Sequence, residues 1–95
     1  MTCDEIEGHF KQVLREVQKD TGHPNARIED DTIPLKDLED FDSLSALDAE
    51  ARLAAILGPN LGTVPFKSPT DGHEMSVREI VDHLCKRLAP PKKAK

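Results

Sequence analysis

Four histidines and two cysteines are the residues of this 95-residue chain that could ligate a soft or borderline metal ion. Their spacing does not support such a site. His83 and Cys85 are two positions apart in a helical pattern and point in different directions. The other three histidines have no partner at the short spacings that zinc sites use. We therefore expect no metal ligand among the six residues, and structural or surface roles for all of them.

The two cysteines, Cys3 and Cys85, stand at opposite ends of the chain. They lack CxxC spacing, so the sequence predicts neither a disulfide framework nor a zinc knuckle. Cys85 comes eight residues after Val77, close to a predicted apolar stripe. This position predicts a buried thiol in the core.

Carboxylates crowd the segment 37–42, which looks superficially like a calcium loop. An EF-hand needs Gly at its sixth position and Glu at its twelfth. A loop starting at Asp31 has Lys36 and Asp42 at these positions, so we reject it. The chain also lacks a P-loop, an HExxH and a GxSxG motif. None of these motifs therefore marks a catalytic site in the chain.

The tripeptide Asp42-Ser43-Leu44 is the remaining candidate for chemistry. Asp42 is a good helix N-cap, which places Ser43 in the first, exposed turn of a helix. The N–H groups of this first turn have no partner within the helix, and the positive end of the helix dipole lies there. The plain alternative is an Asp cap followed by an ordinary serine.

Three long helices must position these residues. Apolar stripes and capping boxes of the type Ser/Thr-x-x-Glu predict helices over about 3–20 and 76–88. Between them a helix starts at Asp42 and ends at Gly58. We expect Leu53, Ile56 and Leu57 of this helix to pack against the stripes of the other two, which are listed here: Ile6, Phe10, Val13, Leu14, Val17, Val77, Val81 and Leu84.

Two long connections join these helices. Residues 21–41 contain two prolines and regularly spaced apolar residues that can pin the connection to the bundle. Residues 58–75 are rich in Gly and Pro, with room for one short turn of helix at 64–66. The chain has three Phe and neither Trp nor Tyr, which favours an all-α bundle over a sheet.

Charge is divided unevenly along the chain. Residues 1–50 carry 14 acidic and 5 basic side chains, whereas residues 51–95 carry 4 acidic and 8 basic ones. The acidic half disfavours nucleic acid and suits a partner with a basic surface. The apolar runs are too short to span a membrane, and the N-terminus has no secretory h-region. We expect a cytoplasmic protein that binds neither nucleic acid nor membrane.

The segment 38–50, with Asp42-Ser43-Leu44 at its centre, resembles the acyl carrier protein family. In that family an Asp-Ser-Leu motif opens the second helix. Other positions agree with the family pattern in the same order: Leu38, Leu47, Asp48, Gly58, Val64-Pro65, Ser76-Val77 and the core pattern over 80–84. The resemblance covers about residues 3–88.

The resemblance implies an acyl-carrier-protein-like four-helix bundle with a short third helix and a long loop between the first two. The carrier domain would span 1–89, and 90–95 would be a disordered basic tail. Ser43, next to Asp42, would covalently hold a 4′-phosphopantetheine arm, whose thiol carries a fatty acyl, polyketide or aminoacyl group as a thioester. The surface for partners would comprise Leu44, Leu47, Asp48, Glu50, Ala51 and Val64.

The implied partners are a phosphopantetheinyl transferase, a ligase that loads the acyl or aminoacyl group, and downstream transferases. The resemblance also implies that the carrier is a monomer and is not itself an enzyme. Asp40 stands where the family usually has Gly, and Arg52 makes the helix less acidic than is typical. These differences favour a specialised carrier with a dedicated partner. The alternative is an unmodified helical interaction module with the same bundle.

Overall fold

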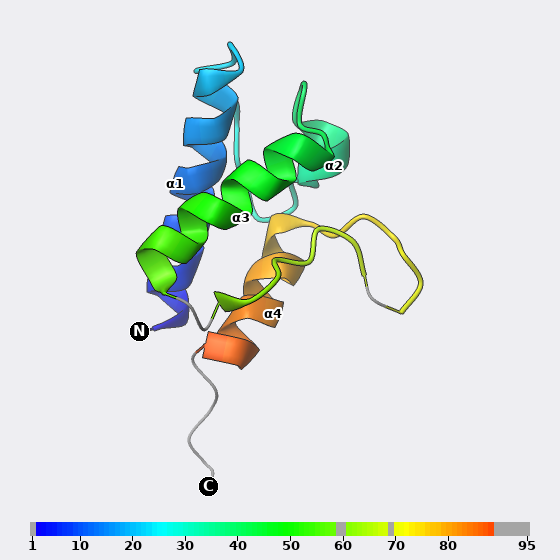
Figure 1. Ribbon diagram of the computed structural model, residues 1–95. Coiled ribbons are helices and arrows are strands. Elements are labelled where there is room, and N and C mark those ends of the chain that lie inside the picture. The colour runs from blue at the N-terminus through cyan, green and yellow to red at the C-terminus, as the bar shows by residue number, and fades with distance from the viewer. Residues whose placement is uncertain (1, 59–60, 69, 89–95) are drawn as a thin grey trace, which may run out of the picture.

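The computed structural model describes residues 2–58, 61–68 and 70–88. Within them the regular elements are four helices, α1 (Cys3–Asp20), α2 (Pro34–Asp37), α3 (Ser43–Leu57) and α4 (Val77–Leu88), beside one isolated bridge between Lys67 and Glu74 (Figure 1). The prediction of a small all-α bundle is confirmed at this level. The basic tail expected over 90–95 lies outside the described residues.

The caps that the sequence predicts are present at the helix starts. Thr2 and Glu5 form a reciprocal capping box, in which Thr2 N donates to Glu5 Oε1 at 2.8 Å. Ser76 and Glu79 repeat the arrangement at α4, with Ser76 N donating to Glu79 Oε1 at 2.9 Å. These bonds satisfy N–H groups that a helix leaves unpaired. They explain why the predicted helix starts are correct to within a residue or two.

The short helix lies elsewhere than predicted. Residues 64–66 form no helix, whereas α2 falls within the connection between α1 and α3. Pro34 is preset for the first helical position because its ring fixes φ and it needs no N–H partner. Asp37 closes the turn by accepting a bond from Ile33 N at 2.8 Å. The turn of helix expected at 64–66 is therefore not formed, and the short helix of the described residues precedes α3.

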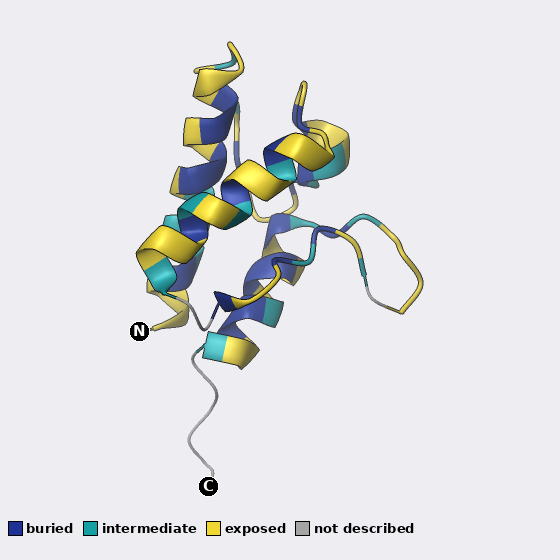
Figure 2. Ribbon diagram, viewed as in Figure 1, coloured by how far each residue is buried: buried dark blue, intermediate teal, exposed yellow. Residues whose placement is uncertain are grey.

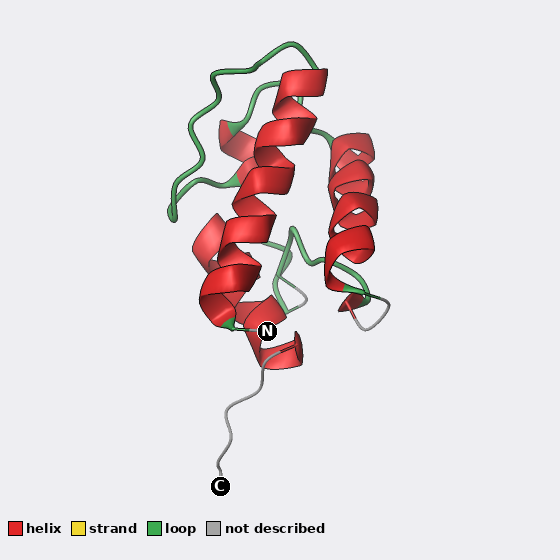
Figure 3. Cartoon of the chain, turned by 90° about the vertical axis from the view of Figure 1, so that its left-hand side faces the viewer, coloured by secondary structure: helices red, strands yellow, loops and turns green. Residues whose placement is uncertain are grey.

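Helix α1 packs against both α3 and α4 (Figures 1 and 3). The predicted apolar stripes of α1 and α4 face this core and are buried, as the dark inner faces in Figure 2 show. Phe66 packs between α1 and the connection 21–41. The centroid of its ring lies 6.1 Å from the ring centroid of Phe10 and 5.5 Å from that of Phe41. The apolar anchors of the connection 21–41 thus join one continuous core.

Helix α3 contributes less to the core than expected. Its buried residues are Ser45, Ala49 and Leu53, a stripe that repeats every four residues. This repeat continues to Leu57, which packs partly buried against the core, and turns Ile56 outward. Ile56 is 43% exposed, so its predicted place in the core is wrong.

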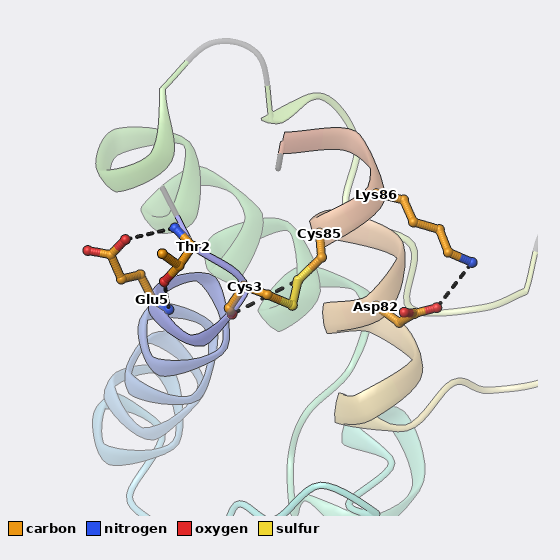
Figure 4. Close-up of a disulfide and its surroundings, with 6 residues drawn as sticks. All are labelled: Thr2, Cys3, Glu5, Asp82, Cys85 and Lys86. Carbon is orange, nitrogen blue, oxygen red and sulfur yellow. Dashed lines mark hydrogen bonds and ion pairs between the residues drawn. A yellow bond between two sulfur atoms is a disulfide. The ribbon is translucent and has the colours of Figure 1, made fainter. Parts of the chain in front are cut away.

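A disulfide joins Cys3 to Cys85, which corrects the prediction of unpaired cysteines (Figure 4). The first residue of α1 lies beside the last turn of α4, and the two Cα atoms are 5.4 Å apart although 82 positions separate them in sequence. This spacing is within the range that a disulfide requires. The burial of Cys85 was predicted correctly, at 7% exposure, but its state as a thiol was not.

Candidate functional site

Ser43 is the first residue of α3, and its side chain is exposed. The cap before it is made by Asp42, whose Oδ1 accepts bonds from the N–H groups of Leu44 and Ser45, both at 3.1 Å. Within the described residues, the Ser43 hydroxyl makes no hydrogen bond. The prediction that Asp42 caps a helix starting at Ser43 is confirmed, and the hydroxyl is open to an incoming group.

The turn before the site depends on Asp40. This residue has a φ of 58°, in the left-handed region where glycine is favoured and Asp is tolerated. Its carbonyl accepts a bond from Ser45 Oγ at 3.2 Å, and its carboxylate lies 2.8 Å from His23 Nε2. Asp40 therefore adopts a backbone conformation that glycine most often supplies. Neither Ser45 nor His23 was singled out from the sequence.

An open hollow of about 420 Å³ lies directly beside Ser43. It is formed by the first two turns of α3, by α2 and by the segment 63–67. Most of its walls are apolar, and its lining residues are Leu35, Ser43, Ala46, Leu47, Glu50, Thr63, Val64, Phe66 and Lys67. The structure thus places a serine hydroxyl at the rim of a mainly apolar hollow.

Two polar side chains hold the segment 61–64, whose residues Thr63 and Val64 line the hollow, by hydrogen bonds to its backbone. Glu50 Oε1 accepts a bond from Val64 N at 2.8 Å, which holds the extended segment against α3. Arg87 of α4 donates to the carbonyls of Leu61 and Thr63, the latter at 2.7 Å. Because these bonds join residues 14 or more positions apart, no local sequence signal indicated them.

The expected partner surface is only partly exposed. Leu44 and Leu47 are 73% and 61% exposed, and Asp48 and Ala51 also face solvent. Val64 is only 4% exposed, so it forms part of the wall of the hollow and not of an exposed patch. Glu50 is half-buried for the same reason.

Arg52 ties α3 to α1 and does not stand as an isolated positive charge. Its guanidinium contacts Asp48 at 3.1 Å and also pairs with Asp20 of α1. Hydrogen bonds to Asp20 and then to Asp48 raise the pKa of Arg52 above its ordinary value. The Asp48 carboxylate is therefore already paired, which weakens its expected role as a free acidic contact for partners.

Residues 67–68 and 70–74 belong to a loop that extends from the wall of the hollow and returns to α4 (Figure 1). His73 lies between two carboxylates, with Nδ1 at 2.6 Å from Asp71 Oδ1 and Nε2 at 3.2 Å from Glu79 Oε2. These bonds, first that to Asp71 and then that to Glu79, raise the pKa of His73. A protonated imidazole donates from both ring nitrogens, so it joins the loop to the first turn of α4.

This contact should depend on pH. Because the pKa of His73 is raised in the folded state, its contribution to stability is complete below the unfolded value of about 6.5 and is lost as pH rises through the folded value. We expect an NMR titration to give a higher pKa for His73 in the wild type than in Asp71→Asn. Equal values in the two proteins would show that the loop does not hold the imidazole.

Within the residues that the structure describes, no three His, Cys, Asp or Glu side chains gather as a metal site would require. No helix of this part is long and apolar enough to cross a bilayer. No family model matches the chain, and comparisons with curated proteins and with solved structures found no match.

Proposed function

We propose that this protein is an acyl carrier protein, with Ser43 as the attachment site of a 4′-phosphopantetheine arm. The observation that carries the proposal is the position of Ser43. Its hydroxyl is exposed and unpaired among the described residues, it opens an Asp-capped helix of 15 residues, and it borders an apolar hollow. Such a serine needs no neighbouring base, since a transferase supplies one.

Electrostatics at the helix start supports a phosphodiester on Ser43. The N-terminus of α3 carries the positive end of the helix dipole, which stabilises a nearby negative charge by about 0.3–1 kcal/mol at an exposed position. The first turn of α3 holds no acidic side chain after the Asp42 cap. Attachment at the exposed Oγ leaves the cap bonds from Leu44 and Ser45 in place.

The hollow supports the next step, which is the handling of a thioester. Ligand sites in proteins typically have volumes of about 300–1,000 Å³, and the hollow measures about 420 Å³. Its walls at Leu35, Leu47 and Phe66 are apolar, so it can cover part of the arm or of an attached acyl group. The carrier itself performs no chemistry, and the thioester reacts in the partner enzymes.

Leu44 and Leu47 offer these enzymes an apolar contact beside the modified serine. We expect Leu47→Ser to slow both arm transfer and cargo loading about tenfold, the effect of losing one buried apolar contact worth about 1–2 kcal/mol. Stability should change by less than about 0.5 kcal/mol, because Leu47 is 61% exposed. The measurement is the rate of each reaction with the purified enzymes.

Ile56→Ser is the matched control, because Ile56 is also an exposed aliphatic residue of α3 but lies near its other end. It should leave both rates unchanged. Equal slowing by the two variants would place the contact with partners outside the start of α3.

The deciding experiment is intact-mass spectrometry of the wild-type protein after incubation with coenzyme A and a broad-specificity phosphopantetheinyl transferase. The proposal expects the mass of one arm, located on Ser43 by peptide mapping. An unchanged mass would favour the second candidate, an unmodified interaction module. That candidate is supported by the exposure of Leu44 and Leu47, which an interaction surface would need as well.

We expect the carrier to be a monomer and to work in the cytoplasm. In the cytosol the Cys3–Cys85 bond would meet a thiol pool that keeps most protein cysteines reduced.

A further inference from the structure

The disulfide lies at the end of the bundle away from Ser43. Helix α3 starts beside α2 and runs toward the end of the bundle where the chain begins (Figures 1 and 3). The bond there connects the first residue of α1 with the last turn of α4 (Figure 4). A change at this bond leaves the immediate surroundings of Ser43 untouched.

The two cysteines differ in their access to solvent. Cys85 is 7% exposed and belongs to the hydrophobic core. Cys3 is exposed and lines an open hollow of about 200 Å³, whose walls include Glu7, Val77 and Val81. A small thiol can therefore approach the bond from the side of Cys3 without opening the core. Exposed disulfides are the ones that exchange readily, whereas buried ones are inert.

We propose that the Cys3–Cys85 disulfide undergoes reversible thiol–disulfide exchange in the folded protein, with Cys3 as the sulfur that is attacked. An external thiolate bonds to Cys3 Sγ and the Cys3–Cys85 bond breaks. Cys85 leaves as a thiolate and takes up a proton. With a dithiol reductant, the second thiol then attacks the mixed disulfide and frees Cys3, so two electrons reduce the protein and the reductant becomes a disulfide.

The surrounding contacts hold α1 and α4 in place during this exchange. Ile6 and Phe10 of α1 and Leu84 of α4 are completely buried in the common core. Lys11 Nζ of α1 also donates to Asp30 Oδ1 at 2.8 Å. The segment around Asp30 is bonded to the start of α4, because the Asp30 carbonyl accepts a bond from Arg78 N. The arrangement keeps Cys85 close to Cys3, so it can attack the mixed disulfide and restore the original bond.

The first test measures how fast the folded wild-type protein reacts with 2-mercaptoethanol and with dithiothreitol, followed by alkylation and mass spectrometry. Exchange in the folded state predicts a rate that rises linearly with thiolate concentration and exceeds the rate of global unfolding. Peptide mapping should place the 2-mercaptoethanol adduct on Cys3. A rate that levels off at the unfolding rate, or an adduct on Cys85, would overturn the proposal.

Single variants test the difference in access directly. Cys85→Ser leaves a free thiol at the exposed position, and Cys3→Ser leaves one in the core. We expect the thiol of Cys85→Ser to react with an aromatic disulfide reagent at least about tenfold faster under native conditions, because access controls this reaction. Equal rates in two variants that are shown to be folded would contradict the proposed direction of attack.

Discussion

Replacing Ser43 with Ala is expected to abolish attachment of the phosphopantetheinyl arm completely, because alanine has no oxygen that could form the phosphodiester. The fold should be unaffected, since the Ser43 side chain is exposed and bonds to none of the described residues. We expect the free energy of unfolding to change by less than about 0.5 kcal/mol. Intact mass after treatment with the transferase and a denaturant titration measure the two quantities.

Ser45→Ala is the matched control, because Ser45 is also a serine in the first turn of α3. It is buried, and its hydroxyl donates to the Asp40 carbonyl at 3.2 Å. This variant should lose about 1 kcal/mol of stability and still accept one arm. Addition of the arm to Ser43→Ala would move the attachment site to another residue and contradict the proposed role of Ser43.

Removing the disulfide should produce the largest loss of stability among the changes considered. The bond closes a loop of 82 residues, and the chain-entropy relation assigns such a loop about 4.5 kcal/mol. Small domains have total stabilities of about 5–15 kcal/mol. The double variant Cys3→Ser, Cys85→Ser should therefore lose between about a third and about nine-tenths of the total stability.

A denaturant titration of the double variant, compared with the oxidised wild type, measures this loss. The wild type kept fully reduced is the matched control and should unfold at nearly the same denaturant concentration as the double variant. A loss below about 1 kcal/mol in both would show that α1 and α4 stay together in the unfolded state or that the bond constrains little. The arm should still attach to Ser43 in the folded fraction, because the disulfide lies at the end of the bundle away from the start of α3 (Figures 1 and 3).

The helices could be predicted because their signals are local. Thr2 and Glu5, or Ser76 and Glu79, lie within one turn and form caps whatever the rest of the fold does. Asp42 likewise determines where α3 begins, and with it the exposure of Ser43. The fold class and the position of the candidate serine therefore followed from the sequence.

The short helix shows where local signals compete. One turn of helix was expected within 64–66, whereas the short helix forms at Pro34–Asp37. Glu50, 14 positions from Val64, accepts a bond from the Val64 N–H, which ties residue 64 to α3. A hydrogen bond from a side chain of another helix cannot be predicted from the residues of the segment alone.

The amino-acid sequence by itself determined the three long helices, their caps and the apolar stripes of α1 and α4, because periodicity and capping act over a few residues. Only the tertiary structure decided that α3 turns Ile56 outward, that Val64 lines a hollow beside Ser43, and that Cys3 meets Cys85. The physical reason is distance along the chain. Contacts between residues separated by 14 to 82 positions depend on how the helices pack, which no spacing within one segment encodes.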